Sequence, residues 1–180
     1  MKKETIKDVI AKKKAEKKNV ASRKEVAAKR IAARQQATKK ASVLGERLAT
    51  KLDARMEKIL LDAEQLVKDH VPARFVSASL TRLQKQLIAQ GIGCKFDKRV
   101  SKETIKRTAN TDVTIDDCNE AIDKIAETVV GLTEETLDDC DNCIHRLAKK
   151  HFADHRVSTI KAMRNTVETK MKATGLNIKL

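Results

Sequence analysis

Residues that build aromatic clusters and tight turns are scarce in this sequence. Its 180 residues include no Trp, no Tyr, three Phe, one Pro and five Gly. Sandwiches, barrels and doubly wound folds need frequent turns and strands rich in aromatic or β-branched residues. The composition therefore argues against those classes and predicts an all-α protein. We expect a basic N-terminal arm, partly disordered or helical, followed by a compact multi-helix bundle.

Long apolar segments are absent as well. The longest aliphatic runs, such as Ile59-Leu60-Leu61, have three residues, whereas a membrane span needs about 18. The N-terminus is rich in Lys from residue 2 and lacks the apolar region of a signal peptide. We therefore expect no membrane partner, reduced thiols, and a cytoplasmic or nucleoid-associated protein (nuclear if the source is eukaryotic).

The charge is spread unevenly along the chain. Lys and Arg number 39 against 25 Asp and Glu, which gives a net charge of +14. Residues 1–40 contribute +11, residues 41–110 +6, residues 111–143 −10 and residues 144–180 +7. A basic block of this kind usually binds a polyanion, whereas a solubilising tail is better made of acids. We interpret residues 1–40 as a nucleic-acid-binding arm and residues 41–180 as the bundle domain.

In the second half of the arm, residues 21–40, the apolar residues are mostly Ala, so a helix there would present basic side chains to phosphates in a groove of DNA or of folded RNA. The aromatic residues that stack single-stranded bases are nearly absent. This favours duplex DNA, with structured RNA as the alternative, and a role in DNA organisation or regulation. The phosphate contacts in the arm are predicted at Lys12, Lys13, Lys14, Lys17, Lys18, Arg23, Lys24, Lys29, Arg30 and Arg34.

Apolar residues recur at spacings of three and four after the arm, which predicts helices. Thr114 and Thr133 have the position of N-caps, while Gly91 and Gly175 precede apolar residues as C′ glycines do. Val157 is expected on the buried side of the last helix. The predicted helices cover about 41–71 (ended by Pro72), 74–90, 115–130 (ended by Gly131), 134–152 and 155–173, with a short one after Ser101.

A second basic cluster lies at 95–107. The sequence VSKETIKR at 100–107 places a capping Ser, a Thr, an aliphatic residue and an Arg in order, and it resembles the start of the recognition helix in helix-turn-helix proteins. The resemblance implies that Ile105 packs on the preceding helix while basic side chains face DNA. Nine residues separate Gly91 from Ser101, where those proteins have a turn of three or four. The contacts would come from Lys98, Arg99, Lys102, Lys106 and Arg107.

Catalytic and metal-binding motifs are missing. The sequence has no GxSxG, P-loop, HExxH or GxGxxG pattern, so we expect no enzyme and no cofactor. A zinc site needs four N or S ligands, and one CxxC falls short of the two pairs of a zinc finger. We therefore expect core thiols and no metal. If a metal were bound, the candidate ligands would be Cys118, Cys140, Cys143 and His145.

A different class of function also fits the sequence. The chain would then be a structural or interaction protein that anchors to a nucleoprotein assembly (a ribosome, a polymerase or a virion interior) and binds protein partners through its bundle. Protein contact or self-association would use the acidic segment 111–143 and the apolar stripe at 44–67. The acidic segment has three further interpretations: a solvated face, a docking site for the basic arm, or one for the basic C-terminal helix.

Overall fold

The computed structural model describes residues 6–102, 104–105 and 112–180, apart from the side chains of 6–19 and 21. This part forms the α-helices α1 (Ile6–His70), α2 (Ala73–Ala89), α4 (Ile115–His151) and α5 (Arg156–Ala173), and the short 3-10 helix η1 (Ala153–His155). The all-α prediction, with a helical arm followed by a bundle, is confirmed. Across these described residues, no helix has the length and hydropathy that a membrane crossing requires.

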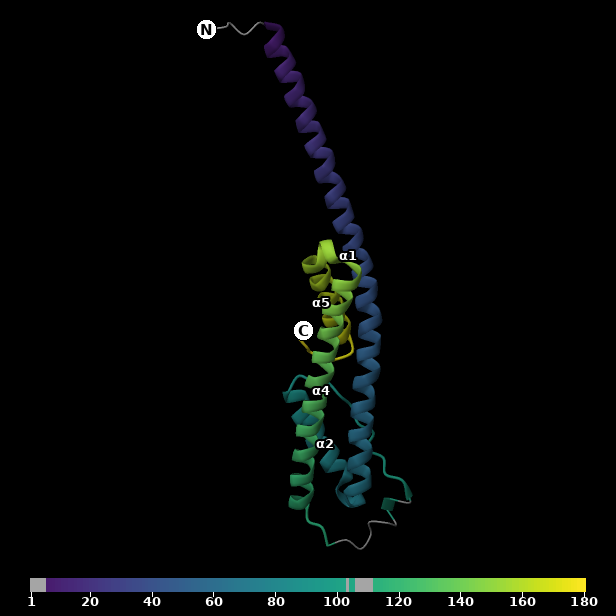
Figure 1. The fold of residues 1–180 in the computed structure, drawn as a ribbon. Helices are drawn as coiled ribbons and strands as arrows, with labels where there is room; N and C mark the ends of the chain where they lie inside the picture. The colour runs from purple at the N-terminus through teal and green to yellow at the C-terminus, as the bar shows by residue number, and fades with distance from the viewer. Residues whose placement is uncertain (1–5, 103, 106–111) are drawn as a thin grey trace.

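The helices pack in three parallel columns (Figure 1). The C-terminal part of α1 is one column, α4 is the second, and α5 and α2 are stacked end to end as the third. Because α4 has 37 residues and the stacked helices have 18 and 17, the second and third columns have nearly the same length. The N-terminal part of α1 projects beyond all of them.

The two stacked helices end in the same way, and their ends meet. Gly91 and Gly175 have φ values of +81° and +94°, the left-handed region that glycine adopts without strain. Each following residue, Ile92 or Leu176, donates a backbone hydrogen bond of 2.9 Å back to its own helix. Ile92 and Leu176 are buried and pair with each other as an antiparallel bridge. Both predicted C′ glycines are therefore confirmed.

Two backbone segments approach each other closely at this junction, which explains why residue 93 is a glycine. The Asn177 N–H donates to the Gly91 carbonyl at 3.1 Å, which brings the two chain segments alongside each other. A Cβ atom on Gly93 would overlap the backbone carbonyl of Gly175. The junction thus has no room for a side chain at residue 93.

Two bidentate ion pairs fix the stacked helices to α4. Arg82 of α2 donates to both carboxylate oxygens of Asp123 at 3.0 and 2.9 Å. Arg164 of α5 donates to both oxygens of Asp141 at 2.8 and 2.7 Å. The two Asp residues are 18 positions apart, which is about five turns, so they share one side of α4. Hydrogen bonding to Arg164 lowers the pKa of Asp141.

The prediction of two separate helices, over 115–130 and 134–152, is wrong, because one helix covers both segments. Helix α4 continues through Gly131, because the buried residues Ala126, Val129 and Cys140 extend one inward stripe across it. That burial outweighs the cost of about 1 kcal/mol for a helical glycine. Thr133 is not a cap: its buried hydroxyl donates to the Val129 carbonyl at 2.7 Å.

Other helix ends agree with the sequence. Thr114 and Asp117 form a reciprocal capping box, and α1 ends at His70, just before Pro72. Helix α1 runs without a break through residue 40. It also continues through Gly45, where a Cβ would lie 3.0 Å from the Met163 carbonyl oxygen of α5. In α5, Val157 was wrongly expected inside, since it is 84% exposed.

Two glycine substitutions should have opposite effects on stability. Gly131→Ala should raise the free energy of unfolding by about 0.5–1 kcal/mol, because Ala favours the helix and no atom lies within 4 Å of the new Cβ. Gly93→Ala should lower it by about 1–3 kcal/mol, because the junction must open. Urea unfolding followed by circular dichroism measures both. Equal effects of the two substitutions would contradict the junction as described.

The Asp141–Arg164 pair should give stability that depends on pH. Asp141→Asn should lower the free energy of unfolding by about 1–2 kcal/mol at neutral pH. The pKa of Asp141 is lower in the folded protein than in the unfolded chain, where it is about 3.9. The ion pair therefore stabilises the fold fully above that pH, and this stabilisation is lost as the pH falls through the pKa of the folded state. The difference between variant and wild type should therefore shrink near pH 3 in urea titrations.

Asp139→Asn is the matched control on the same helix. Asp139 pairs with Arg55 at 3.1 Å, but both side chains are more than half exposed. Its replacement should cost less than about 0.5 kcal/mol. A cost for Asp139→Asn as large as that for Asp141→Asn would show that Asp141 and Arg164 do not fix α5 to α4.

Candidate nucleic-acid interface

The N-terminal part of α1 leaves the bundle as a single projecting helix (Figure 1). Every side chain from Ser22 to Gln36 is exposed, and Ala41 is the first buried residue among the described side chains of α1. We call residues 20–36 the α1 extension. It continues a helix that is packed further along, and most of its residues are Ala, Arg, Lys or Gln, which favour helix.

Three arginines of the α1 extension lie along one side. Arg23, Arg30 and Arg34 are separated by seven and four positions, which places them within about 40° of one another around the helix axis. All three are exposed. Within the part of the chain that the structure describes, none of them has a carboxylate partner. Their guanidinium groups are thus available to an external anion. We call these three residues the arginine stripe.

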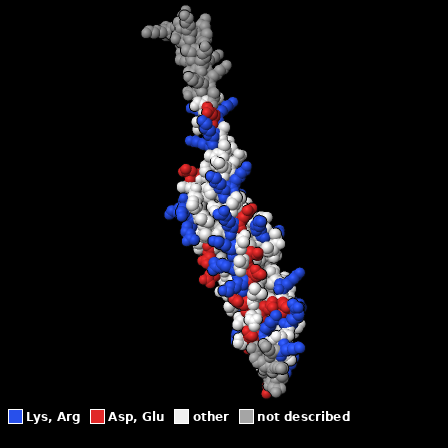
Figure 2. Space-filling view, turned by 90° about the vertical axis from the view of Figure 1, so that its right-hand side faces the viewer, with Lys and Arg blue, Asp and Glu red and all other residues white. Residues whose placement is uncertain are grey.

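The remaining predicted arm residues surround this stripe. Lys24 and Lys29 are exposed, and Lys29 pairs with Glu25, the one acid of the extension, at 2.8 Å. Figure 2 shows Lys and Arg outweighing acidic residues over the extension, whereas both signs are interleaved over the bundle. The other predicted contacts lie earlier in α1, and their side chains are outside the described residues: Lys12, Lys13, Lys14, Lys17 and Lys18.

Basic residues that sequence reasoning missed continue along α1 onto the bundle, about 100° around the helix axis from the arginine stripe. Lys40, Arg47 and Lys51 follow the arm on one side of α1, at spacings of seven and four. The same seven-and-four spacing is visible in the sequence, and it identifies them once the basic residues are followed beyond the arm. Lys51 lines a groove of about 540 Å³ between α1 and α4 together with Arg146.

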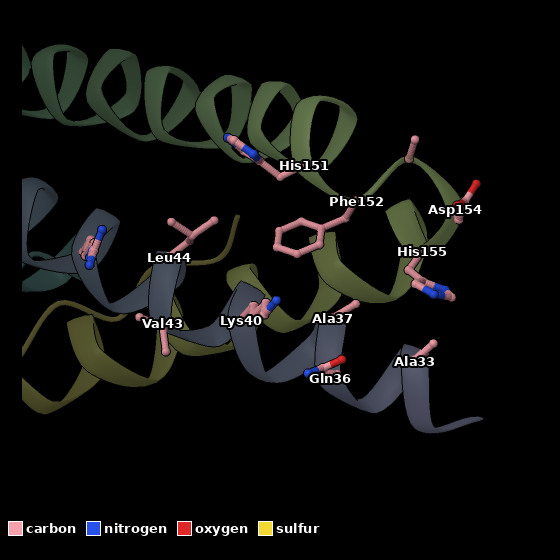
Figure 3. Close-up of a pocket in the computed structure, with 12 residues that line it drawn as sticks. Ala33, Gln36, Ala37, Lys40, Val43, Leu44, His151, Phe152, Asp154 and His155 are labelled. Atoms are coloured by element: carbon pink, nitrogen blue, oxygen red, sulfur yellow. The ribbon is translucent and has the colours of Figure 1, made fainter. Parts of the chain in front are cut away.

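A second groove lies where the α1 extension meets the bundle (Figure 3). It has a volume of about 710 Å³ and is formed by α1 on one side and by the turn from α4 through η1 on the other. We call it the α1/η1 groove. Phe152 points into it, with Lys40 on the opposite wall. Its lining is Ala33, Gln36, Ala37, Lys40, Val43, Leu44, Arg47 and residues 151–155.

The second predicted contact, at 95–107, lies far from the arm. The Asp97 N–H donates to Glu64 near the end of α1 at 3.0 Å, and Glu64 is 30 residues, or about 45 Å, from Arg34 along the helix. Lys98 and Lys102 are exposed there. Arg99 is also exposed, but it is engaged with Asp97 at 2.9 Å. The hydrogen bonds from Arg99 lower the pKa of that carboxyl to about 2.

The described part of the 100–107 motif lacks the packing that its resemblance implies. Ser101 is an N-cap as predicted, since its Oγ accepts from the Thr104 N–H at 3.1 Å. Ile105, expected against the preceding helix, is 50% exposed, and the chain between Ile92 and Ser101 is irregular. Lys106 and Arg107 are outside the described residues.

The cysteines do not form a ligand set. Cys118 and Cys140 are buried in α4, 22 residues or about 33 Å apart. No group of three His, Cys, Asp or Glu side chains able to hold a metal occurs among the described residues. Cys143 and His145 are partly exposed near Cys140, and His145 lies 3.1 Å from Arg164.

The acidic segment 111–143 is partly used within the bundle. Asp123, Asp139 and Asp141 pair with Arg82, Arg55 and Arg164. The pair between Asp141 and Arg164 is a contact of the acidic segment with the C-terminal helix, which was one of its predicted docking partners. The α1 extension, which belongs to the other predicted partner, projects away from the bundle. Most of the 44–67 apolar stripe is buried or half-buried inside this chain. The segment leaves an exposed row on α4, in which Glu120 pairs with Lys124 of the same helix at 2.7 Å. The row is made of Asp116, Glu120, Glu127, Glu134 and Asp138.

Comparisons of this chain with protein families, with curated proteins and with solved structures find no match.

The thiols should differ in reactivity, because the thiolate is the reacting form. Burial raises the pKa of Cys94 and of Cys140 to about 11, which leaves roughly one thiolate in a thousand near pH 8. Cys143 is partly exposed, and its sulfur lies 3.7 Å from the Arg146 guanidinium. Iodoacetamide should therefore modify Cys143 first, as peptide mass spectrometry would show. Equal rates in the folded protein would contradict this placement, while equal rates in urea are expected.

Proposed function

We propose that this chain is a non-enzymatic nucleic-acid-binding protein that holds phosphates on the α1 extension, with duplex DNA as the favoured ligand and structured RNA as the alternative. The observation that carries the proposal is the arginine stripe. Arg23, Arg30 and Arg34 are exposed and have no carboxylate partner among the described residues. Guanidinium groups with free donors bind phosphate oxygens, often with two hydrogen bonds at once.

The shape of the extension supports the same ligand. An α-helix with its side chains is about 10–12 Å across, and the major groove of B-DNA is about 12 Å wide. Ala27 lies on the same side as the arginine stripe, four positions after Arg23 and seven before Arg34, and its short side chain lets the helix backbone come close to the nucleic acid there. The extension spans about 25 Å along its axis, enough for several successive phosphates. Binding of this kind depends on charge, so it weakens as salt rises.

A second candidate function is supported by the exposed row on α4. Asp116, Glu120 and Glu127, with Glu134 and Asp138, lie within about 40° around the helix axis. Such a row would face a basic protein surface in an interaction protein that anchors to a nucleoprotein assembly. Exposed carboxylates attract a partner weakly and become less effective in salt. We therefore place this function second.

Removing the arginine stripe tests the first proposal. The triple variant Arg23→Gln, Arg30→Gln, Arg34→Gln keeps a high helix propensity and removes three positive charges. Fluorescence anisotropy with labelled duplex DNA and with folded RNA, across a salt series, should show weaker binding. The slope of log K against log salt should become shallower by roughly 2–3, because each phosphate that the variant no longer neutralises accounts for about 0.9.

A matched control removes the same charge from the bundle. Lys85, Lys170 and Lys172 are exposed on α2 and α5, and their replacement by Gln should leave the slope nearly unchanged. A decrease as large as that of the arginine variant would mean that net charge alone binds the ligand. Absence of binding by the wild-type chain near physiological salt would reject the proposal and leave the α4 row as the surface to pursue.

A further inference from the structure

We propose that the α1/η1 groove receives one unpaired nucleotide, with its base against Phe152 and its phosphate beside Lys40 and Arg47. This inference rests on the proposed binding of nucleic acid by the α1 extension, and it specifies the ligand further. The preferred nucleic acid would be a duplex with an unpaired nucleotide at its end. The sequence alone favours duplex DNA or structured RNA over single strands, because aromatic residues are so few.

Phe152 supplies the surface on which a base would stack. It is the C-cap of α4, and its side chain is half-buried and points into the groove (Figure 3). Its N–H donates to the Ala148 carbonyl at 3.0 Å, and its carbonyl accepts from the His155 N–H at 2.9 Å. These bonds hold the backbone on both sides of the ring. Aromatic rings placed in this way stack any of the bases.

The other two phenylalanines have different surroundings. Phe96 is buried in the core. Phe75 lies under the guanidinium of Arg74, 4.8 Å from its ring centroid. Among the three, Phe152 alone lines a groove with basic residues on the opposite wall.

The opposite wall provides the space. Ala33 and Ala37 are one helical turn apart on α1 and face the groove, and their short side chains keep it open. The volume of about 710 Å³ lies within the range of roughly 300–1,000 Å³ typical of small-molecule sites. Val43 and Leu44 add apolar lining that suits the faces of a base.

The charge of the groove suits a phosphate. Lys40 and Arg47 are seven positions apart on the same side of α1, both exposed, and neither has a carboxylate partner in the described part of the chain. His151 and His155 add ring nitrogens to the lining. Asp154, the one carboxylate there, points away from Phe152 (Figure 3).

The groove is also within reach of a strand bound on the extension. Lys40 lies six residues after Arg34, about 9 Å further along the helix, and on a neighbouring side of it. A strand whose duplex part contacts the arginine stripe would therefore arrive at the groove with its next unpaired nucleotides. The extension and the groove would act as one continuous surface for a duplex end.

The test compares three hairpin duplexes on the full chain. One is blunt, one carries three unpaired nucleotides that include 2-aminopurine, and one carries three abasic units. The abasic probe has the same added phosphates without bases, so it separates stacking from charge. The wild-type chain should bind the base-containing probe roughly ten-fold more tightly than the abasic one, with quenching of 2-aminopurine on stacking.

Phe152→Leu keeps an apolar side chain and removes the ring. It should abolish the preference for bases and the quenching, while binding of the blunt duplex stays within two-fold, about 0.4 kcal/mol. Phe75→Leu, a substitution outside the groove, should behave as wild type. If Phe152→Leu fails to fold, as circular dichroism would show, the exposed pair Lys40→Gln and Arg47→Gln replaces it, and this variant should lose more affinity for the base-containing probe than for the blunt one.

Each outcome bears on one proposal. Equal binding of the base-containing and abasic probes by the wild-type chain would overturn the nucleotide site, as would a preference that survives Phe152→Leu. In the replacement variant, an equal decrease in affinity for the base-containing and blunt probes would overturn it too. Binding of the blunt duplex in those cases would still leave the α1 extension as a nucleic-acid binder. No binding of any probe would instead reject the proposed function itself.

Discussion

The fold depends on the contact between the C-terminal ends of α2 and α5. Helix C-termini carry partial negative charge and unpaired carbonyls, so two of them do not attract each other. Here Gly91 and Gly175 turn each chain back on its own helix, and the buried pair Ile92 and Leu176 closes the space between them. Two short helices thereby form a column as long as α4, and this column covers α4 and the C-terminal part of α1 along their length.

Glycine shows most clearly how much of this fold the sequence could predict. Gly91, Gly131 and Gly175 are each followed by an apolar residue, and the local pattern predicted a helix end at all three. It was right at Gly91 and Gly175. It was wrong at Gly131, because Ala126, Val129 and Cys140 keep one buried stripe in phase across the glycine. Local sequence signals do not contain that packing, so only the tertiary structure decides between a helix end and a continuous helix.

The candidate site shows a similar division. The arm residues were identified from charge alone, and the spacing of Arg23, Arg30 and Arg34 fixes their common side once the helix is known. Arg99 was identified by the same reasoning, yet its guanidinium is engaged with Asp97 two residues away. The α1/η1 groove joins segments more than 100 positions apart, such as Ala33 and Phe152. No local pattern predicts that pairing, because it depends on where α4 ends relative to α1.

The continuity of α1 has a mechanical consequence. Helices bend sharply at Pro, at Gly pairs or at bulges, and Pro72 lies beyond the end of α1. Its internal glycine, Gly45, is held against α5, with the carbonyl oxygen of Met163 3.0 Å from where a Cβ would be. A sideways pull at Arg23 therefore acts on a stiff lever of about 27 Å measured from Ala41. The resulting torque falls on the contacts between α1 and α5, so a load applied to the extension would be transmitted to the packed part of the molecule.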